Sequence, residues 1–167
     1  MRLAALILSV ALLTPLDSVS AGDPPLRVST FQVDVTPPLG SPLCNGNVTP
    51  VLEVATPLTA RGVVLIGAND PIVLCAIDWV GIGNESYDAF RKALADAVRT
   101  TPDRVALHTL HQHDAPRCDF SADELLTECG LGGVGFDVDF ARDVIDRAAA
   151  AVKSALEDAQ PATHLGI

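Results

Sequence analysis

The arrangement of apolar and polar positions predicts four β-strands in the first two thirds of the chain. Residues 28–35 alternate, and a following Pro-Pro pair ends the run because proline donates no ladder hydrogen bond. Residues 61–66 and 72–77 are rich in β-branched side chains, and the turn-forming residues between them predict a hairpin. A further strand is predicted over residues 104–110.

Two segments change to the helical period. In residues 85–99 apolar side chains return every three or four positions, and Asn84 or Ser86 is expected to cap the helix. Residues 137–159 carry a continuous apolar stripe, which predicts a long helix with one buried face. The Gly-rich residues 114–136 that precede it are expected to be irregular.

Two other segments have a weaker pattern. Residues 41–58 are rich in Pro, Gly, Asn and Thr, which leaves open an ordered or a mobile loop. Residues 163–167 are expected to begin another strand, which is typical of a fragment of a longer protein. Neither of these segments predicts a second domain.

The order of strand, helix and strand over residues 72–110 predicts a βαβ unit with parallel strands and a right-handed crossover. With the hairpin, it predicts an α/β fold in which helices pack on a mixed sheet. Ligands of such sheets bind beyond the carboxyl ends of the strands. Asp78 and His111 each follow a predicted strand directly, so this edge is the first candidate for a site.

The first 21 residues have the pattern of an export signal. Arg2 gives a positive start, residues 3–13 form an apolar run, and residues 19–21 are small at the cleavage spacing. The run is shorter than the roughly 20 apolar residues that span a bilayer. We therefore expect residues 1–21 to be a signal peptide and residues 22–167 to be secreted or periplasmic, with no membrane-spanning segment. A retained anchor or a buried first helix is the alternative.

Net charge and hydrophobic content restrict the partners. The formal charge is −10 and the pI is near 4.6. No basic cluster is present that would neutralise phosphates, which argues against nucleic acid and anionic membranes as electrostatic partners. A hydrophobic fraction of 49% argues against an intrinsically disordered chain.

Export permits disulfides, and the chain has four cysteines. None has Cys-x-x-Cys spacing, which argues against a zinc ribbon. Cys118 and Cys129 lie in the same Gly-rich segment and are the candidate pair. Cys75 lies inside a predicted strand and is expected to be a buried free thiol.

Three histidines fall close together, and two of them are candidate metal ligands. Residues two apart on an extended backbone point to the same side, so His111 and His113 can face one Zn²⁺ ion. His108 is expected to face the opposite way. Asp114 follows directly and is a candidate to orient an imidazole or to act as a base. The alternative is that these are polar loop residues without a metal.

Two imidazoles do not complete a zinc site. A catalytic zinc needs about three protein ligands and an open position for water, and no third ligand is obvious in the sequence. Asp78 ends an apolar strand and is either part of the site or a residue on the approach to the helix. Asp34 ends the first strand, and we expect its side chain to bond the nearby backbone in a turn.

A series of motifs resembles the neutral, non-lysosomal ceramidase family. Residues 31–40 (FQVDVTPPLG) resemble the family's Asp-Ile-Thr-Pro-Pro-Gly opening, and residues 60–65 (ARGVVL) resemble one of its strands. Residues 77–81 (IDWVG) resemble its Asp-x-x-Gly turn, and residues 111–116 (HQHDAP) resemble its Thr-His-Thr-His-Ser-Gly-Pro segment. The motifs stand in the family's order from about residue 28 onward.

This resemblance implies that residues 22–167 are the incomplete N-terminal part of a ceramidase-like catalytic domain. Members of the family are zinc-dependent amidases that convert ceramide to sphingosine and a fatty acid, which implies a lipid or N-acyl substrate. It also implies that His111, and secondly His113, bind zinc. The family's other zinc ligands, a histidine, a glutamate and a tyrosine, lie beyond the length of this chain.

The chain also departs from the family's pattern. The Ser-Gly that follows the family's histidines is Asp114-Ala115 here, and the preceding threonine is Leu110. With Asp78 and Asp114 as candidate catalytic residues, the sequence favours an amide hydrolase that is incomplete as it stands. A catalytically inactive, exported binding module of the same fold is the alternative.

Overall fold

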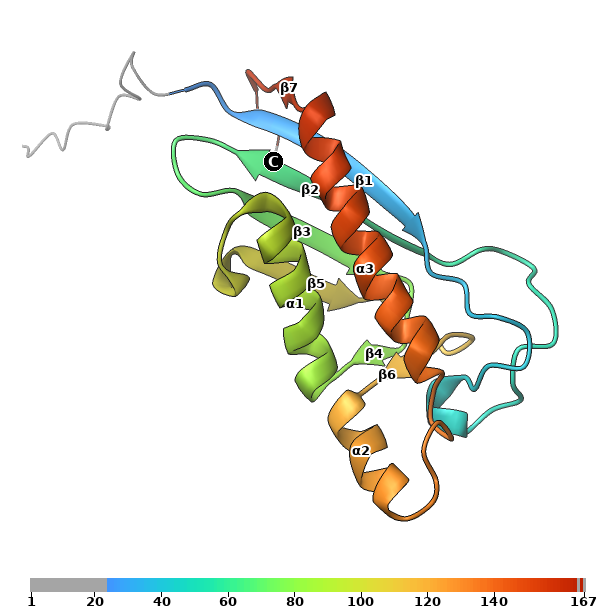
Figure 1. Ribbon diagram of the computed structural model, residues 1–167. Helices are drawn as coiled ribbons and strands as arrows, with labels where there is room; N and C mark the ends of the chain where they lie inside the picture. The colour runs from blue at the N-terminus through green and yellow to red at the C-terminus, as the bar shows by residue number, and fades with distance from the viewer. Residues whose placement is uncertain (1–23, 165, 167) are drawn as a thin grey trace, which may run out of the picture.

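The computed structural model describes residues 24–164 and residue 166, and a five-stranded mixed sheet runs through it (Figure 1). The strand order is β5-β3-β2-β1-β7. β1, β2 and β3 pair in antiparallel fashion, whereas β3 and β5 are parallel, which confirms the predicted hairpin and βαβ unit. The strands of this sheet are β1 (Arg27–Asp34), β2 (Thr59–Ile66), β3 (Ile72–Ile77), β5 (Val105–Thr109) and β7 (Gln160–Pro161).

The alternation of side chains in β1 gives the sheet one buried face. Ser29, Phe31 and Val33 are buried, while Thr30 and Gln32 between them are exposed. Successive side chains of a strand point to opposite faces, so the more apolar side of the predicted strand is the one that enters the core. The expected alternation is therefore confirmed.

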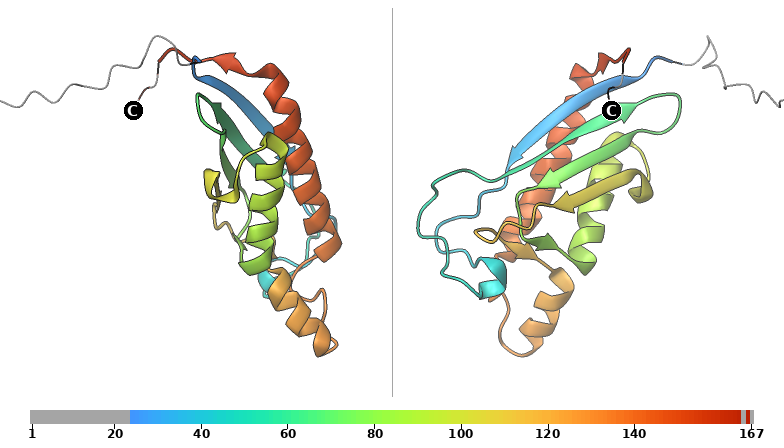
Figure 2. Two further views of the ribbon diagram at one scale, coloured as in Figure 1. Left: turned by 60° about the vertical axis from the view of Figure 1, so that its left-hand side comes forward. Right: turned by 180° about the vertical axis from the view of Figure 1, so that it is seen from behind.

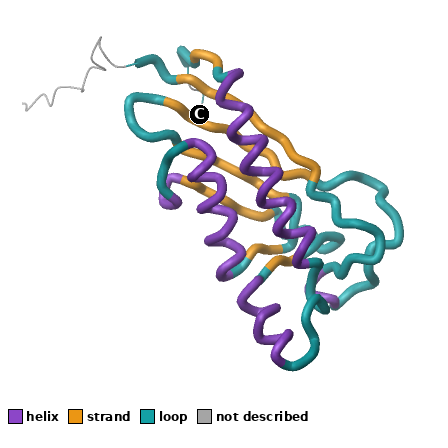
Figure 3. Tube along the Cα trace, viewed as in Figure 1, coloured by secondary structure: helices purple, strands orange, loops and turns teal. Residues whose placement is uncertain are grey.

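Two long helices cover this buried face. α1 (Asn84–Val98) and α3 (Val138–Ala155) lie side by side on it, as the views in Figures 1 and 2 and the tube in Figure 3 show. Phe90 of α1 and Val144 of α3 are fully buried between helices and sheet. No helix of residues 24–164 covers the opposite face, where Leu74 is 41% exposed.

A small second sheet and a third helix extend the fold beyond β5. β4 (Gly81–Ile82) pairs in parallel with β6 (Arg117–Cys118), and α2 (Phe120–Glu128) follows. Asp119 caps α2 by accepting a hydrogen bond from the backbone N–H of Ala122 at 3.1 Å. The prediction that residues 114–136 are irregular was therefore wrong over β6 and α2. Short 3-10 turns lie at η1 (Cys44–Gly46), η2 (Pro102–Arg104) and η3 (Leu156–Asp158).

The start of α1 differs from the predicted cap. Gly83 occupies the cap position, and neither Asn84 nor Ser86 caps the helix. Asn84 instead donates to Asp119 at 2.8 Å, and the buried Ser86 hydroxyl accepts from the backbone N–H of Phe120 at 2.7 Å. These side chains connect α1 to α2, because the two helix starts lie next to each other.

The cysteine prediction was right for one residue and wrong for the proposed pair. Cys75 is a buried free thiol, as expected, but Cys118 and Cys129 are also free. Cys118 is buried before α2 and Cys129 is exposed after it. A helix of this length separates its ends by about 14 Å, whereas the Cα atoms of a disulfide lie about 4–7 Å apart.

The connection between β1 and β2 is anchored by backbone hydrogen bonds. Gly40 N donates to Val51 O at 2.8 Å, Val51 N donates to Ser41 O at 3.1 Å, and Cys44 N donates to Ala115 O at 2.9 Å. Of the two alternatives for residues 41–58, these contacts favour the ordered loop.

The turn before this loop was predicted correctly. Asp34 accepts from the backbone N–H of Thr36 at 2.8 Å, which is the expected bond to nearby backbone. The hydroxyl and then the backbone N–H of Thr36 lower the pKa of Asp34 below its usual value, since both bonds favour the charged carboxylate.

The final strand begins earlier than the sequence suggested. β7 is Gln160–Pro161 and pairs with Arg27 and Val28, whereas the prediction placed a strand start at residue 163. Residues 165 and 167, like the expected signal at 1–21, lie outside the described residues. Within the described part of the chain, no helix combines the length and the apolar content that crossing a bilayer requires.

Candidate functional site at the carboxyl ends of β3 and β5

The candidate site forms where two parallel strands end side by side. The pairing continues past β3 and β5, because Leu110 N donates to Ile77 O and His111 N donates to Trp79 O, each at 3.0 Å. Trp79 is fully buried, and its indole N–H donates to Val35 O at 3.0 Å. The histidine segment is therefore fixed to a rigid part of the core.

His111 has a constrained backbone and a defined ring contact. Its φ is +60°, in the left-handed region, where histidine is several-fold enriched among non-glycine residues. Its Nδ1 lies 2.9 Å from the carbonyl oxygen of Val80. A carbonyl only accepts hydrogen bonds, so Nδ1 carries the proton in this arrangement. Nε2 is then the nitrogen with a free lone pair.

The rings of His111 and His113 lie next to each other. Their centroids are 5.0 Å apart and their planes are at 73°. Two imidazoles that share one tetrahedral zinc also have centroids about 5 Å apart. Edge-to-face aromatic pairs span the same range, about 4.5–7 Å. The structure thus brings together the two residues predicted as metal ligands, although the expected extended backbone is absent, because His111 has a φ of +60°. Their zinc binding stays a prediction.

The donor set at this pair is too small for a catalytic zinc. In the described part of the chain, no group of three or more histidine, cysteine, aspartate or glutamate residues is placed to hold a metal ion. His108 is exposed on β5, on the opposite side from the buried Leu107. The residues present would therefore supply two imidazoles to a zinc site and leave at least one ligand unassigned.

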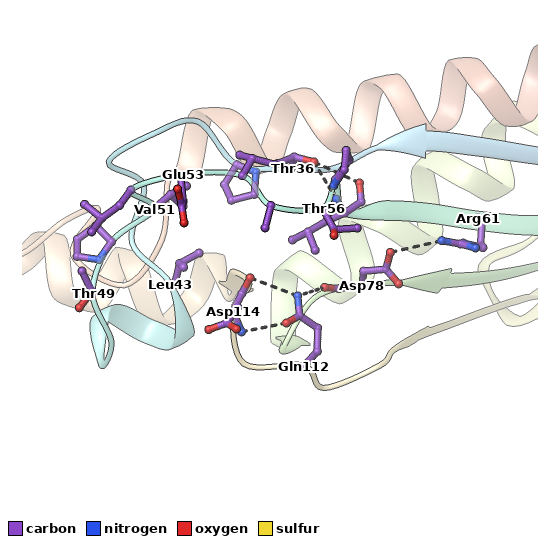
Figure 4. Close-up of a pocket in the computed structure, with 17 residues that line it drawn as sticks. Thr36, Leu43, Thr49, Val51, Glu53, Thr56, Arg61, Asp78, Gln112 and Asp114 are labelled. Atoms are coloured by element: carbon purple, nitrogen blue, oxygen red, sulfur yellow. Dashed lines mark hydrogen bonds and ion pairs between the residues drawn. The ribbon is translucent and has the colours of Figure 1, made fainter.

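The predicted carboxylates border a cavity instead. A cavity of about 680 Å³ opens beside the carboxyl ends of the strands, and neither His111 nor His113 lines it (Figure 4). Asp78 and Asp114 do. Its other lining residues are Thr36, Pro37, Leu43, residues 49–58, Arg61 and Gln112. In this structure the candidate catalytic residues are thus grouped with the cavity, and the candidate metal ligands are not.

Asp78 is held by β2. One of its carboxylate oxygens accepts from the backbone N–H and from the hydroxyl of Thr59, both at 2.8 Å, and lies 3.7 Å from Arg61 Nη2. Arg61 in turn donates to the Thr59 hydroxyl from Nε at 2.9 Å and from Nη2 at 2.6 Å. This chain of bonds connects the end of β3 to β2.

Asp114 has a different environment from Asp78. It is exposed, and among the described residues its carboxylate makes no hydrogen bond to either imidazole. Its backbone is instead bound by the side chain of Gln112. The role of orienting an imidazole therefore has no support in the contacts, whereas a role at the polar end of the cavity is compatible with its position.

Thr59, Arg61 and Gln112 connect these groups, and none of them was predicted from the sequence as a site residue. Gln112 stands between the two histidines, and Arg61 interrupts an apolar strand with a charge. A charged residue within a strand and an amide inside a His-x-His segment are only weak indications of a functional site. The contacts of Thr59 and Gln112 with Asp78 span 19 and 34 residues, so they depend on the fold.

The chain is similar to known proteins in its three-dimensional structure. No family model matches the chain, and no curated protein matches it. The solved structure of neutral ceramidase from Pseudomonas aeruginosa is similar, with a TM-score of 0.62 and 17% sequence identity. A structure of a ceramidase complexed with C2 is also similar, with a TM-score of 0.57 and 18% identity.

The similarity is extensive in this chain and partial in the ceramidases. It covers 82% of this chain and 22% of each ceramidase chain. At this level of identity the comparison shows the fold alone. The fold that the motif resemblance implied is confirmed: this chain has the mixed α/β fold of part of a neutral ceramidase.

Proposed function

We propose that this chain is part of a zinc-dependent amide hydrolase of the neutral ceramidase type. Its substrate class would be ceramide or a related N-acyl lipid, which is cleaved to a sphingoid base and a fatty acid. The observation that carries the proposal is the pairing of the His111 and His113 rings at the strand ends of a ceramidase-like fold. The chain spans about a fifth of the ceramidase structures that it matches.

The proposal assigns separate roles to the two histidines. His111 would bind the ion through Nε2, because Val80 already engages Nδ1. His113 would supply the second imidazole. A bound zinc polarises an amide carbonyl and lowers the pKa of a water molecule. The two imidazoles would hold the ion with water in the other positions, and any further protein ligand would come from outside the described residues.

The cavity supports a substrate with a long apolar part. Its wall over residues 50–58 carries Val51, Leu52, Val54 and Leu58, and its other end carries polar groups. Of the two carboxylates, Asp114 is the better candidate for acid–base work, because Asp78 already accepts two hydrogen bonds from Thr59. Export of the chain, inferred from residues 1–21, is part of the same proposal.

A non-enzymatic, exported binding module is the second candidate. It is favoured by one observation, the absence of a third metal ligand within the described residues. Such a module would use the cavity without zinc.

Zinc binding by the purified chain distinguishes the two candidates. We expect a single zinc site by titration against a chromogenic chelator, with binding lost in His111→Asn and weakened in His113→Asn. His108→Asn is the matched control, because His108 is exposed on β5 outside the pair. Equal zinc binding by all four proteins, or none by the wild type, would refute the hydrolase proposal and favour the binding module.

A further inference from the structure

Gln112, the residue between the two histidines, uses both ends of its side chain. Its Nε2 donates to the carbonyl oxygen of Asp78 at 2.9 Å and to that of Asp114 at 3.3 Å. Its Oε1 accepts from the backbone N–H of Asp114 at 2.9 Å. The side chain is half-buried at the wall of the cavity, where Figure 4 shows these bonds.

These bonds act on residues 112–114, between His111 and the next anchor of the segment, where Cys44 N donates to Ala115 O at 2.9 Å. His111 is held by its backbone bond to Trp79 and by its ring bond to Val80. Among the described residues, the His113 ring makes no hydrogen bond, and it is exposed. Both neighbours of His113 are in the Gln112 network, since Gln112 binds the end of β3 and also binds Asp114.

We propose that Gln112 is a positioning residue that holds the His113 imidazole against that of His111. The ring separation of 5.0 Å then depends on two different restraints, one on each histidine. The Val80 carbonyl restrains the first, and the Gln112 side chain restrains the second through the backbone. The relevance of this arrangement to zinc rests on the proposed function, whereas the restraint itself exists without a metal.

Gln112→Met is the variant that tests this role. Methionine keeps the length of the side chain and adds no charge, but it makes none of the three hydrogen bonds. Gln32→Met is the matched control, because Gln32 is exposed on β1, which pairs with β2 and β7 and not with β5. Near-ultraviolet circular dichroism of the buried Trp79 reports on the fold. If Gln112→Met loses that signal, Gln112→Ala repeats the comparison.

The first measurement is made without metal. Wild type and Gln32→Met should show nuclear Overhauser effects between the ring protons of His111 and His113, and folded Gln112→Met should lose most of that intensity. The second measurement is zinc affinity, which should fall about tenfold or more in Gln112→Met and stay unchanged in Gln32→Met. A merely structural role would leave ring proximity intact in the folded variant.

The outcomes separate this inference from the proposed function. Unchanged ring contacts in folded Gln112→Met, or no such contacts in the wild type, would overturn the positioning role. If the wild type binds no zinc but the ring contacts still depend on Gln112, the positioning role stands and the hydrolase proposal fails. If zinc binds and Gln112→Met changes neither measurement, the hydrolase proposal stands and the positioning role fails.

Discussion

Residues of the same type have different environments in this protein, and the cysteines show this most directly. Cys75 and Cys118 are buried, and burial raises the pKa of each thiol to about 12. Cys118 additionally contacts the Ser86 hydroxyl at 3.0 Å. Cys129 is exposed at the end of α2. The thiolate is the reactive form, so a raised pKa and limited access both slow alkylation of the buried pair.

We therefore expect iodoacetamide to modify Cys129 first in the folded protein and to leave Cys75 and Cys118 unmodified on the same timescale. Mass spectrometry of peptides after a timed reaction provides the measurement. In denaturant all of these thiols should react. Rapid alkylation of Cys118 in the native protein, or a Cys118–Cys129 disulfide in the unreduced sample, would contradict the structure.

Contacts of single residues were predictable where the partner lies close in the sequence, whereas the role of the two histidines as metal ligands stays a prediction. The His-x-His spacing and the Asp34 turn involve contacts over two positions, and the structure has both rings together and the Asp34–Thr36 bond. The Gln112 contact to Asp78 spans 34 positions. A polar side chain that binds distant backbone leaves no periodic pattern, so its role follows only from the fold.

At the scale of elements, the pairing of β2 with its neighbours depends on Gly62, which has no side chain. A Cβ atom at Gly62 would lie 2.0 Å from the carbonyl oxygen of Leu74 and 2.7 Å from the ring of Phe31. Real Cβ atoms do not approach backbone oxygens this closely, so the β2–β3 pairing would have to move. At Gly67, in the turn of the hairpin, a Cβ would meet nothing within 4 Å.

Gly62→Ala should therefore lower the free energy of unfolding by about 1–3 kcal/mol, the usual cost of forcing extra atoms into a packed region. Gly67→Ala is the control and should change it by less than about 0.5 kcal/mol. Urea denaturation followed by far-ultraviolet circular dichroism measures both. Equal stability of the two variants would show that β2 and β3 are not paired in this register.

Long elements with a regular period were predicted well, and short ones were not. α1 and α3 each repeat a buried face over several turns, and the structure has them within a few residues of the predicted bounds. α2 has nine residues and only Phe120 buried, so its pattern is weak. β4 and β6 have two residues each, and their pairing joins segments far apart in the sequence.

The whole molecule has its stable core on one side of the sheet. The central strands β2 and β3 are paired on both sides, and the helices α1 and α3 cover the same face. By contrast, residues 52–57 at the wall of the cavity are exposed. The fold class could be predicted from periodicity, whereas the meeting of the cavity, Asp78 and Gln112 needed the actual arrangement of the loops.

Hydrogen exchange should reflect this distribution. Amides of β2 and β3 are expected to exchange most slowly, with opening free energies near that of global unfolding, and amides of residues 52–56 are expected to exchange much faster. Exchange followed by mass spectrometry at peptide resolution provides the measurement. Fast exchange throughout β3 would argue against its central place in the sheet.

The left-handed backbone of His111 also affects how its loss should be studied. Alanine at this position would remove the imidazole and would also place a residue that disfavours positive φ there. Two effects would then be combined in one measurement. Asparagine adopts this conformation far more readily, so His111→Asn deletes the ring while preserving the main-chain preference. Only such a replacement attributes a lost property to the missing nitrogen rather than to a distorted turn.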